Sequence, residues 1–550
     1  MLFTYMKVNR VLLFATVIFM ASACKNDESG YDQLNALAAK EYLEPIRPGN
    51  EAGNLWWNIH SKKFIYAPVF GFERIPGAVR YRYTATQPED STSRKWTFIA
   101  GSPNEALSKM WNKIPPGKTK LKVEGLNEAG DVVGIAGERN FVRDFPFHGP
   151  YHGPARDYHE AAVRAAVFIH EMSCTKYWLD HDSPNLSIPQ NTYTSPEISA
   201  LAAVECFVAK MRPDLAGEAL IIARKAGDFV LKTSGAPGGP FPNFPASYGE
   251  APGERDPDAA YVRKVQAELK GTTMTYNGSL ALIAWVNLWE QTGEQRWFDA
   301  ATTLMDTYSK FQREDGSWPS RFNLETGEVL NPAGSNSAQF LFVSRMLSDK
   351  FPMHKWKDMI DRNETWLKGW VESTFDMTQQ FNDTRRHTID RYSNLTGLFP
   401  SYISRYILQQ DALSEKDLTM VRDLVRVGED QFAHWNSFPD AFGFQSEPTP
   451  CVHEQYGYEV PVDDSSASLA MAFLALWKRT GEELAFAKAK ALMDKMTLIQ
   501  NSVTGQIPTI WKHETSTMRL LTGFWINCNF WDIVALEEMA EADAEYKRLH

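Results

Sequence analysis

The sequence predicts a mainly α-helical protein: an (α/α)6 toroid preceded by a small fibronectin-III-like β-sandwich. Apolar residues recur at the helical period of about 3.6 from Arg156 to the C-terminus, and they alternate at period two between Lys63 and Phe145. The helical stretches also come in pairs, one amphipathic and one apolar on nearly every side. With 550 residues the chain is longer than one ordinary domain, which agrees with this division.

Composition and charge narrow the function before any motif is considered. Hydrophobic residues make up 43% of the chain and charged residues 23%, as in globular proteins. The net charge of -11 argues against a nucleic-acid partner, which needs a basic face. Aromatic residues make up 13% of the chain. Most are expected in the core, and a minority on loops are candidates for stacking on sugar rings.

The first 23 residues are predicted to be an export signal. Lys7 and Arg10 precede the apolar stretch 11–20, which is about half of what a membrane-spanning helix needs. The small residues 21–23 then lead into Cys24. This arrangement resembles a bacterial lipobox, which implies that Cys24 is acylated and anchors the protein to the outer membrane. An ordinary signal peptide followed by a chance cysteine is the alternative.

No cofactor or metal site is indicated by the motifs. The other four cysteines, Cys174, Cys206, Cys451 and Cys528, lie far apart and form no CxxC pair. The glycine-rich stretch 235–245 lacks the spacing of a phosphate-binding loop, and its prolines remove N–H donors.

Residues 24–62 are expected to form a tether and N-terminal segment, and residues 63–146 the β-sandwich. Within the latter, Val79–Tyr83 places apolar side chains on one face and arginines on the other. Pro and Gly interrupt the alternation about every ten residues, as turns do. The stretch 147–154, rich in Pro, Gly and His, is predicted to be the hinge to the next domain.

Twelve helices are predicted in the toroid domain, residues 157–550. The amphipathic helices are expected at 157–172, 214–232, 294–311, 355–371, 415–435 and 481–500, and the apolar ones at 196–210, 276–291, 335–348, 391–409, 463–479 and 524–541. A helix that is apolar on every side must be buried on every side, so six partly exposed helices should surround six buried ones. A helical solenoid is the alternative, but it favours a fixed repeat length, and these pairs recur at uneven intervals.

Long loops lead from each outer helix to the next inner helix, so all six are expected on the rim that holds the inner-helix N-termini. Loops of this length in a compact domain are usually functional. The loop 312–321 contains Asp315, Trp318 and Arg321. Asp315 precedes glycine and is either a turn former or a catalytic carboxylate. Trp318 is a candidate sugar platform.

The densest polar cluster precedes the fifth inner helix and contains His453, Glu454 and Tyr456. Asp463 or Asp464 is expected to cap that helix. Glu454 has no such local role, so its carboxyl is a candidate general acid with a raised pKa. His453 and Tyr456 are expected to bind substrate.

Two further inner-helix starts supply candidate binding residues. Asp390, Arg391 and Tyr392 open the fourth inner helix, and the planar fork of an arginine matches a uronate carboxylate. A solvated surface is the alternative for this charged stretch. Tyr276 and Asn277 add a phenol and an amide at the second inner helix.

On the helix pairing, the Asp315–Pro319 string DGSWP and the lipoprotein leader, residues 157–541 resemble the six-hairpin glycosidase class. Its members include unsaturated glucuronyl hydrolases, exo-β-glucuronidases and toroid polysaccharide lyases. Exported lipoproteins of the Bacteroidota with this architecture belong to glycan-degrading systems, so the resemblance implies a glycan substrate.

The leading prediction is therefore a glycoside hydrolase that acts on a uronate-containing glycan through paired carboxyl groups. Glu454 is the expected acid, with Asp390 or Asp315 as its partner, and Arg391 and Arg321 hold the uronate.

Two alternatives stay open. In a polysaccharide lyase, Arg391 would neutralise the uronate while Tyr456 or His453 removes the C5 proton. The other alternative is a non-catalytic glycan-binding lipoprotein.

Overall fold

The computed structural model describes residues 27–47, 57, 60–88, 93–186, 188–249, 270–334, 337–375, 396–437, 448–456, 458–511 and 524–550. The predicted signal peptide, Cys24 and the predicted site residues Asp390, Arg391 and Tyr392 lie outside these ranges. Among the helices so described, none is long and apolar enough to cross a membrane.

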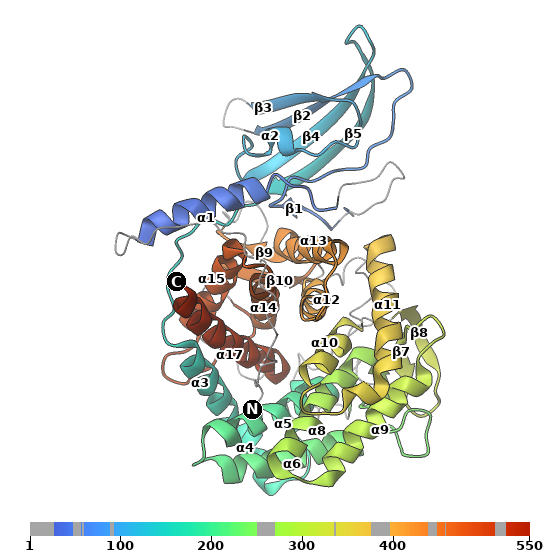
Figure 1. The fold of residues 1–550 in the computed structure, drawn as a ribbon, viewed down its shortest axis with the longest axis vertical. Coiled ribbons are helices and arrows are strands. Elements are labelled where there is room, and N and C mark those ends of the chain that lie inside the picture. Colours follow the sequence, from blue (N-terminus) through green and yellow to red (C-terminus); the bar gives the residue numbers. More distant parts are fainter. Residues whose placement is uncertain are drawn as a thin grey trace.

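The N-terminal part consists of one helix and one β-sheet (Figure 1). Helix α1 (Asp27–Glu41) lies in the segment expected as a tether and packs on the toroid through α15. The sheet contains β1 (Lys63–Phe64), β2 (Arg80–Pro88), β3 (Ser93–Ala100), β4 (Gly117–Leu126) and β5 (Val132–Arg143), with the short helix α2 (Ser108–Trp111) between β3 and β4. Its strand order is β1-β5-β4-β2-β3, and only the β1–β5 pair is parallel.

The alternation of β2 correctly predicts one buried face, and the β-domain expected before the toroid is present; its described strands form one five-stranded sheet. Tyr81 and Tyr83 point inward, whereas Arg82 points to solvent. The inward face is covered by α2 and by the segment before β2. At Gly137 that segment lies so close that a Cβ atom would stand 2.1 Å from the Phe72 ring. Strand alternation indicates that a face is buried, but not whether a loop or a second sheet covers it.

The toroid forms as predicted. Its outer helices are α3 (Tyr158–Glu171), α6 (Ala216–Lys232), α9 (Gln295–Phe311), α11 (Lys357–Thr374), α13 (Glu415–Phe432) and α15 (Glu483–Ile499). Its inner helices are α5 (Thr194–Met211), α8 (Gly278–Thr292), α10 (Ala338–Met346), α12 (Leu398–Leu408), α14 (Asp463–Thr480) and α17 (Ile526–Leu549). Each inner helix contacts the next, and α17 contacts α5, which closes the ring (Figure 1). The short helix α4 (Ser173–Asp180) follows α3.

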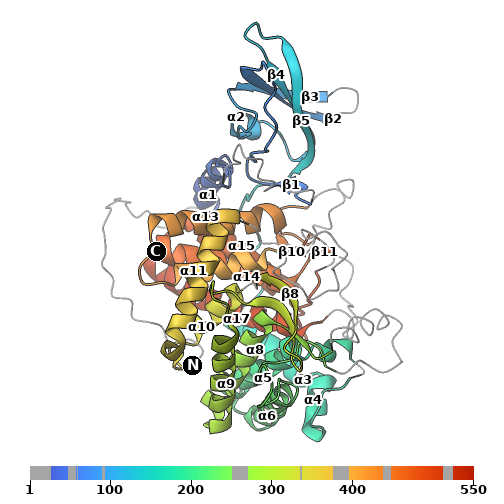
Figure 2. The same cartoon turned by 90° about the vertical axis from the view of Figure 1, so that its right-hand side faces the viewer.

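Small sheets stiffen the rim loops, a feature that the sequence did not predict. One contains β6 (Thr272–Met274), β7 (Pro319–Asn323) and β8 (Val329–Gly334). The other contains β9 (Ala433–His434), β10 (Cys451–Gln455) and β11 (Tyr458–Pro461). Figure 2 shows β8, β10 and β11 on the same side of the toroid.

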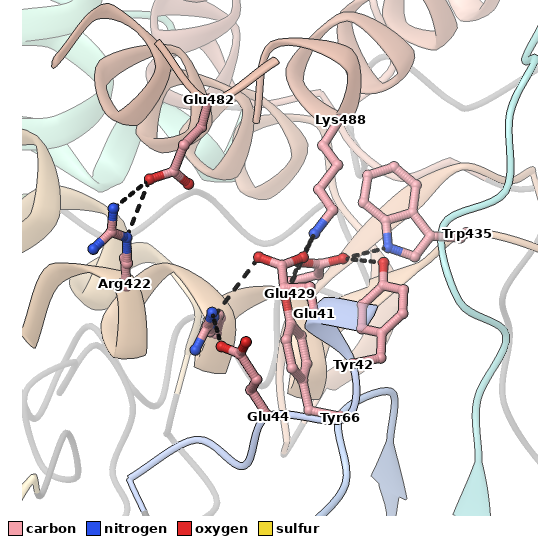
Figure 3. Close-up of polar contacts among 10 residues, drawn as sticks. Glu41, Tyr42, Glu44, Tyr66, Arg422, Glu429, Trp435, Glu482 and Lys488 are labelled. Atoms are coloured by element: carbon pink, nitrogen blue, oxygen red, sulfur yellow. Dashed lines mark hydrogen bonds and ion pairs between the residues drawn. The ribbon is translucent and has the colours of Figure 1, made fainter. Parts of the chain in front are cut away.

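A buried charged network, the junction cluster, attaches the N-terminal part to the toroid (Figure 3). It consists of Glu41, Tyr42, Tyr66, Arg426, Glu429, Trp435 and Lys488. Lys488 Nζ lies 2.8 Å from Glu429 Oε2 and 2.6 Å from Glu41 Oε2. Tyr42 and Tyr66 each donate a hydrogen bond of 2.8 Å to the Glu429 carboxylate. Burial raises the pKa of Glu41, but the charges of Lys488 and Arg426 outweigh it, so the pKa lies below its ordinary value.

Candidate active site at the centre of the toroid

Acidic side chains meet where three inner helices begin, at α5, α14 and α17. We call this group the central cluster; it consists of Glu197, Glu454, Asp463, Asp464, Cys528 and Asp532. One carboxylate oxygen of Asp463, one of Asp464 and the Cys528 sulfur all lie within 4.8 Å of one another. Cys528 and Asp532 are four residues apart on α17, so they lie on the same face of the helix.

Asp463 and Asp532 form the closed side of this cluster, and both are fully buried. The Asn529 amide donates a hydrogen bond of 2.9 Å to Asp463 Oδ2. Burial raises the pKa of Asp463 well above its ordinary value, and the neighbouring carboxylates of Asp532 and Asp464 raise it further. Burial likewise raises the pKa of Asp532. Two adjacent buried carboxyl groups cannot both ionise at low cost, so this pair holds a proton.

Glu197 ties α5 to the start of α17. Its carboxylate accepts backbone N–H bonds from Ile526 (3.1 Å) and Asn527 (3.0 Å). Burial raises the pKa of Glu197 to about 7, although these two N–H groups act in the opposite direction.

Asp464, Cys528 and Glu454 form the accessible side. Asp464 is 8% exposed, and Cys528 and Glu454 are partly exposed. Burial raises the pKa of Asp464 to about 6 against hydrogen bonds from Ser465 and Cys528. Burial also raises the pKa of the Cys528 thiol. Four nearby carboxylates raise it further, those of Asp464, Asp463, Glu454 and Glu197. Glu454 is therefore near enough to Cys528 to belong to this cluster.

Neither aspartate is the N-cap residue of α14. The helix begins after Val462, and Asp463 Oδ1 accepts the N–H of Asp464. In the described part of the chain, no lysine or arginine forms an ion pair with the carboxyl groups of Glu197, Asp463, Asp464 or Asp532. The described groups that shift the pKa values of these four carboxyls likewise include no cation.

An aromatic wall adjoins the acidic groups. It consists of Tyr193, Tyr248 and Tyr276 with Met274, and Trp525 packs against it. The Tyr193 and Tyr276 hydroxyls lie 2.9 Å apart. The Tyr193 ring lies 4.8 Å from the Tyr248 ring and 6.1 Å from the Trp525 ring, centroid to centroid. Because Trp525 immediately precedes the backbone amides that bind Glu197, the wall borders the central cluster.

Arg321 lies next to this wall. It pairs with Met274 across β6 and β7, so the two side chains share one face of the sheet. Arg321 is only 2% exposed, and none of its guanidinium nitrogens has a hydrogen-bond partner among the described residues. A buried cation without an anionic partner is unfavourable, so this position suits an incoming anion.

His453 and Glu454 lie on opposite sides of β10, because adjacent strand residues point to opposite faces, whereas Tyr456 follows the end of the strand. The His453 ring lies 4.2 Å from that of His434. Tyr456 donates a hydrogen bond to Gln431 and lies 3.1 Å from the Ser61 hydroxyl. Both therefore face the N-terminal part, and Glu454 alone reaches the central cluster.

Two other predictions are corrected. Asp315 is exposed and accepts hydrogen bonds from the N–H (2.9 Å) and hydroxyl (2.7 Å) of Ser317, so it is a turn former. Its loop is attached to outer helix α11, where Asn363 donates to the Gly316 carbonyl. Trp318 is fully buried and donates its indole N–H to the Tyr308 carbonyl, which rules out a sugar platform.

Tyr276 joins the aromatic wall as described. Asn277 is fully buried, and its amide donates to Ser247 Oγ at 2.6 Å.

Several site residues were missed from the sequence, among them Glu197, Asp532, Tyr193 and Tyr248. Glu197 and Asp532 do carry a signal, because each is an acid among mostly apolar residues in the first half of an inner helix. A buried acid needs a specific reason to be there. The two tyrosines precede inner helices on loops and offer no comparable signal.

No protein-family model matches the sequence, and no curated protein sequence is significantly similar to it. The structure is similar to that of D-mannose isomerase, with a TM-score of 0.51 and 11% identity over 71% of this chain and 100% of that chain. This likeness supports the toroid fold of the described helices.

Two other solved structures are similar at lower TM-scores. A family 76 glycoside hydrolase from a bovine Bacteroides thetaiotaomicron strain has a TM-score of 0.45 and 10% identity, over 84% of this chain and 93% of that chain. An unsaturated glucuronyl hydrolase specific for heparin has a TM-score of 0.43 and 10% identity, over 70% of this chain and 98% of that chain.

Proposed function

We propose that this protein is a glycoside hydrolase that acts on a uronate-containing glycan, with Asp464 as general acid and Glu454 as the partner carboxylate. The observation that carries the proposal is a group of buried carboxyls, Glu197, Asp463, Asp464 and Asp532, which no described lysine or arginine pairs with. It lies beside an aromatic wall and beside Arg321, whose guanidinium has no hydrogen-bond partner among the described residues. Strongly shifted pKa values of this kind are typical of functional sites.

The two roles follow from exposure and burial. Asp464 has a pKa raised to about 6, so a substantial fraction is protonated near neutral pH and can protonate the glycosidic oxygen as the C–O bond breaks. Glu454, on the accessible side, either activates the water whose hydroxyl joins the anomeric carbon or attacks that carbon itself. Asp463 and Glu197 are enclosed and hold α14 and α17 in place.

The uronate specificity rests on Arg321. Its guanidinium can form two parallel hydrogen bonds with a carboxylate, which relieves the cost of its burial. The phenol rings of the aromatic wall offer apolar faces to sugar C–H groups.

Product analysis with an acidic oligosaccharide tests the proposal. We expect wild-type protein to release reducing ends without ultraviolet absorbance, and Glu454→Gln and Asp464→Asn to lose about 10²- to 10⁴-fold in kcat. Asp315→Asn, an exposed carboxyl outside the cluster, is the matched control and should keep wild-type turnover. Ultraviolet-absorbing products would indicate a lyase, and binding without product would indicate a glycan-binding protein; either result overturns the hydrolase.

Lipid anchoring is a separate part of the proposal. The leader before Cys24 supports an acylated N-terminus at the outer membrane. The variant Cys24→Ala should move the protein from the membrane fraction to the soluble fraction; an unchanged distribution would contradict the anchor.

A further inference from the structure

A groove of about 660 Å³ lies away from the central cluster, between the hinge and the toroid. We call it the hinge groove. Phe145 and Tyr151 of the hinge line one side, and Lys495 on α15 lines the other together with Ala491 and Leu498. The three α15 residues are spaced four and three apart, so they present one continuous face of the helix.

The floor of the hinge groove is rigid. Trp435 lies beneath it with 1% exposure, and its indole N–H donates to Glu429 Oε1 at 2.9 Å (Figure 3). The Tyr151 ring lies 6.0 Å from the Trp435 ring, and the Tyr151 hydroxyl accepts the backbone N–H of His148. The junction cluster therefore holds the partly exposed Tyr151 ring in a defined orientation.

The charge of the hinge groove differs from that of the chain. The protein carries a net charge of -11, yet none of the described residues that line the groove is an aspartate or a glutamate. Lys495, His148 and His152 instead supply N–H donors beside the aromatic rings. Aromatic faces beside a lysine and N–H donors, with no carboxylate among the described lining residues, are complementary to a sugar that bears an acidic group.

The hinge groove is also connected to the central cluster through β10. Pro450 lines the groove, and Glu454 lies four residues further along. At about 3.3 Å per strand residue this path is about 13 Å long. This separation is shorter than the length of a glycan of several units.

We infer that the hinge groove is a second binding site for an acidic oligosaccharide, which holds a part of the glycan remote from the bond that is cleaved. This inference rests on the proposed function for the choice of an acidic glycan. It assigns Tyr151 and Phe145 as stacking residues, and Lys495 and His152 as partners of the acidic groups.

Calorimetric titration of full-length Asp464→Asn protein tests the inference without turnover. The probe is a hexasaccharide of alternating glucuronate and N-acetylglucosamine, and the neutral comparison is a hexamer of N-acetylglucosamine. Because one hexasaccharide can reach both sites, we expect a single binding event that is tighter for the acidic probe than for the neutral hexamer. Adding Lys495→Gln and His152→Ala should weaken this event about tenfold or more. Lys416→Gln, an exposed lysine on α13, is the matched control.

A single binding event that the Lys495 and His152 substitutions do not weaken overturns the inference, as does equal binding of the neutral hexamer. A groove occupied by a second copy of the chain would appear as a concentration-dependent dimer that the substitutions disrupt, and this also overturns it. Full turnover by Asp464→Asn would instead refute the proposed function. The affinities measured with and without the Lys495 and His152 substitutions would still show whether the groove binds the acidic probe. Thermal melting of each variant confirms that it is folded.

Discussion

The junction cluster and the central cluster both bury carboxyl groups, but among the described residues lysine and arginine pair only with those of the junction cluster and not with Glu197, Asp463, Asp464 or Asp532. Glu429 is fully buried and lies 2.8 Å from Lys488 Nζ. Asp463 is equally buried, yet no described lysine or arginine pairs with it or with Asp464. The pKa of Glu41 accordingly lies below its ordinary value, whereas those of Glu197 and Asp464 are raised to about 7 and about 6.

This difference separates carboxyl groups that stabilise the fold from carboxyl groups that can take part in catalysis. A carboxylate with a fixed cation stays ionised and holds two parts of the chain together, so it has no proton to give. A buried carboxyl without a cation keeps its proton to a higher pH and can donate it to a substrate. The first arrangement occurs where the N-terminal part joins the toroid, and the second where the inner helices begin.

The largest expected effect is that of removing the proton donor. Asp464→Asn should lower kcat on an acidic oligosaccharide by about 10²- to 10⁴-fold with little change in melting temperature, because the amide occupies the same space. In wild-type protein kcat/KM should fall as pH rises above about 6, where Asp464 loses its proton. Steady-state kinetics across pH checks the lower kcat of Asp464→Asn and the pH dependence of wild-type kcat/KM. A wild-type kcat in Asp464→Asn would contradict the role of Asp464.

Breaking the junction cluster should affect stability and not chemistry. Lys488→Met leaves Glu429 buried without its cation and leaves Glu41 with Arg426 alone, so it should lower the free energy of unfolding by about 3–5 kcal/mol. Adding Glu429→Gln should recover part of the loss. Urea denaturation measures the change, and the exposed pair of Lys416 and Glu372 provides a control in Lys416→Gln, which should change stability little. A free energy of unfolding for Lys488→Met equal to that of the wild type would refute the structural role of this cluster.

Glu197 should make the protein less stable as pH rises. Its pKa is about 7 in the folded protein and 4.5 ordinarily, so the folded state holds the extra proton between these values. The resulting stabilisation is complete below pH 4.5 and is lost by about pH 7, on the order of 3 kcal/mol. Glu197→Gln should remove this dependence, as seen in urea denaturation at several pH values. The exposed Glu325→Gln is the control, and identical pH profiles for the Glu197 variant and wild type would contradict the shift.

The smallest effect concerns Arg321. Arg321→Met should leave stability unchanged or raise it, because a buried guanidinium without a partner is removed. Affinity for the acidic oligosaccharide should fall by about tenfold or more, and affinity for a neutral one should not change. Paired calorimetric titrations and melting curves measure this; a loss of stability with equal binding of both sugars would show a purely structural arginine.

The toroid could be predicted because its signal is local. The fifth inner helix was expected at 463–479 and spans Asp463–Thr480, since a helix apolar on every side has few alternatives to burial. The number of layers in the β-domain was not predictable in this way, because alternation indicates only that one face is covered.

The site was predictable only in part. Glu454 reaches the central cluster, but His453 and Tyr456 face the N-terminal part, and only the strand itself, which was not predicted, reveals this. Trp318 is equally aromatic whether it stacks on a sugar or fills the core, so its burial depends on contacts between distant segments. Which carboxyl groups lack a cation is likewise a property of packing and not of sequence order.

The most direct test of the central claim compares the two clusters in one assay. Turnover of an acidic oligosaccharide by Asp464→Asn and by Lys488→Met is measured at a temperature where both variants are folded. Asp464→Asn should be nearly inactive, and Lys488→Met should retain close to the wild-type rate. Equal activity of the two variants, or inactivity of Lys488→Met alone, would contradict this claim.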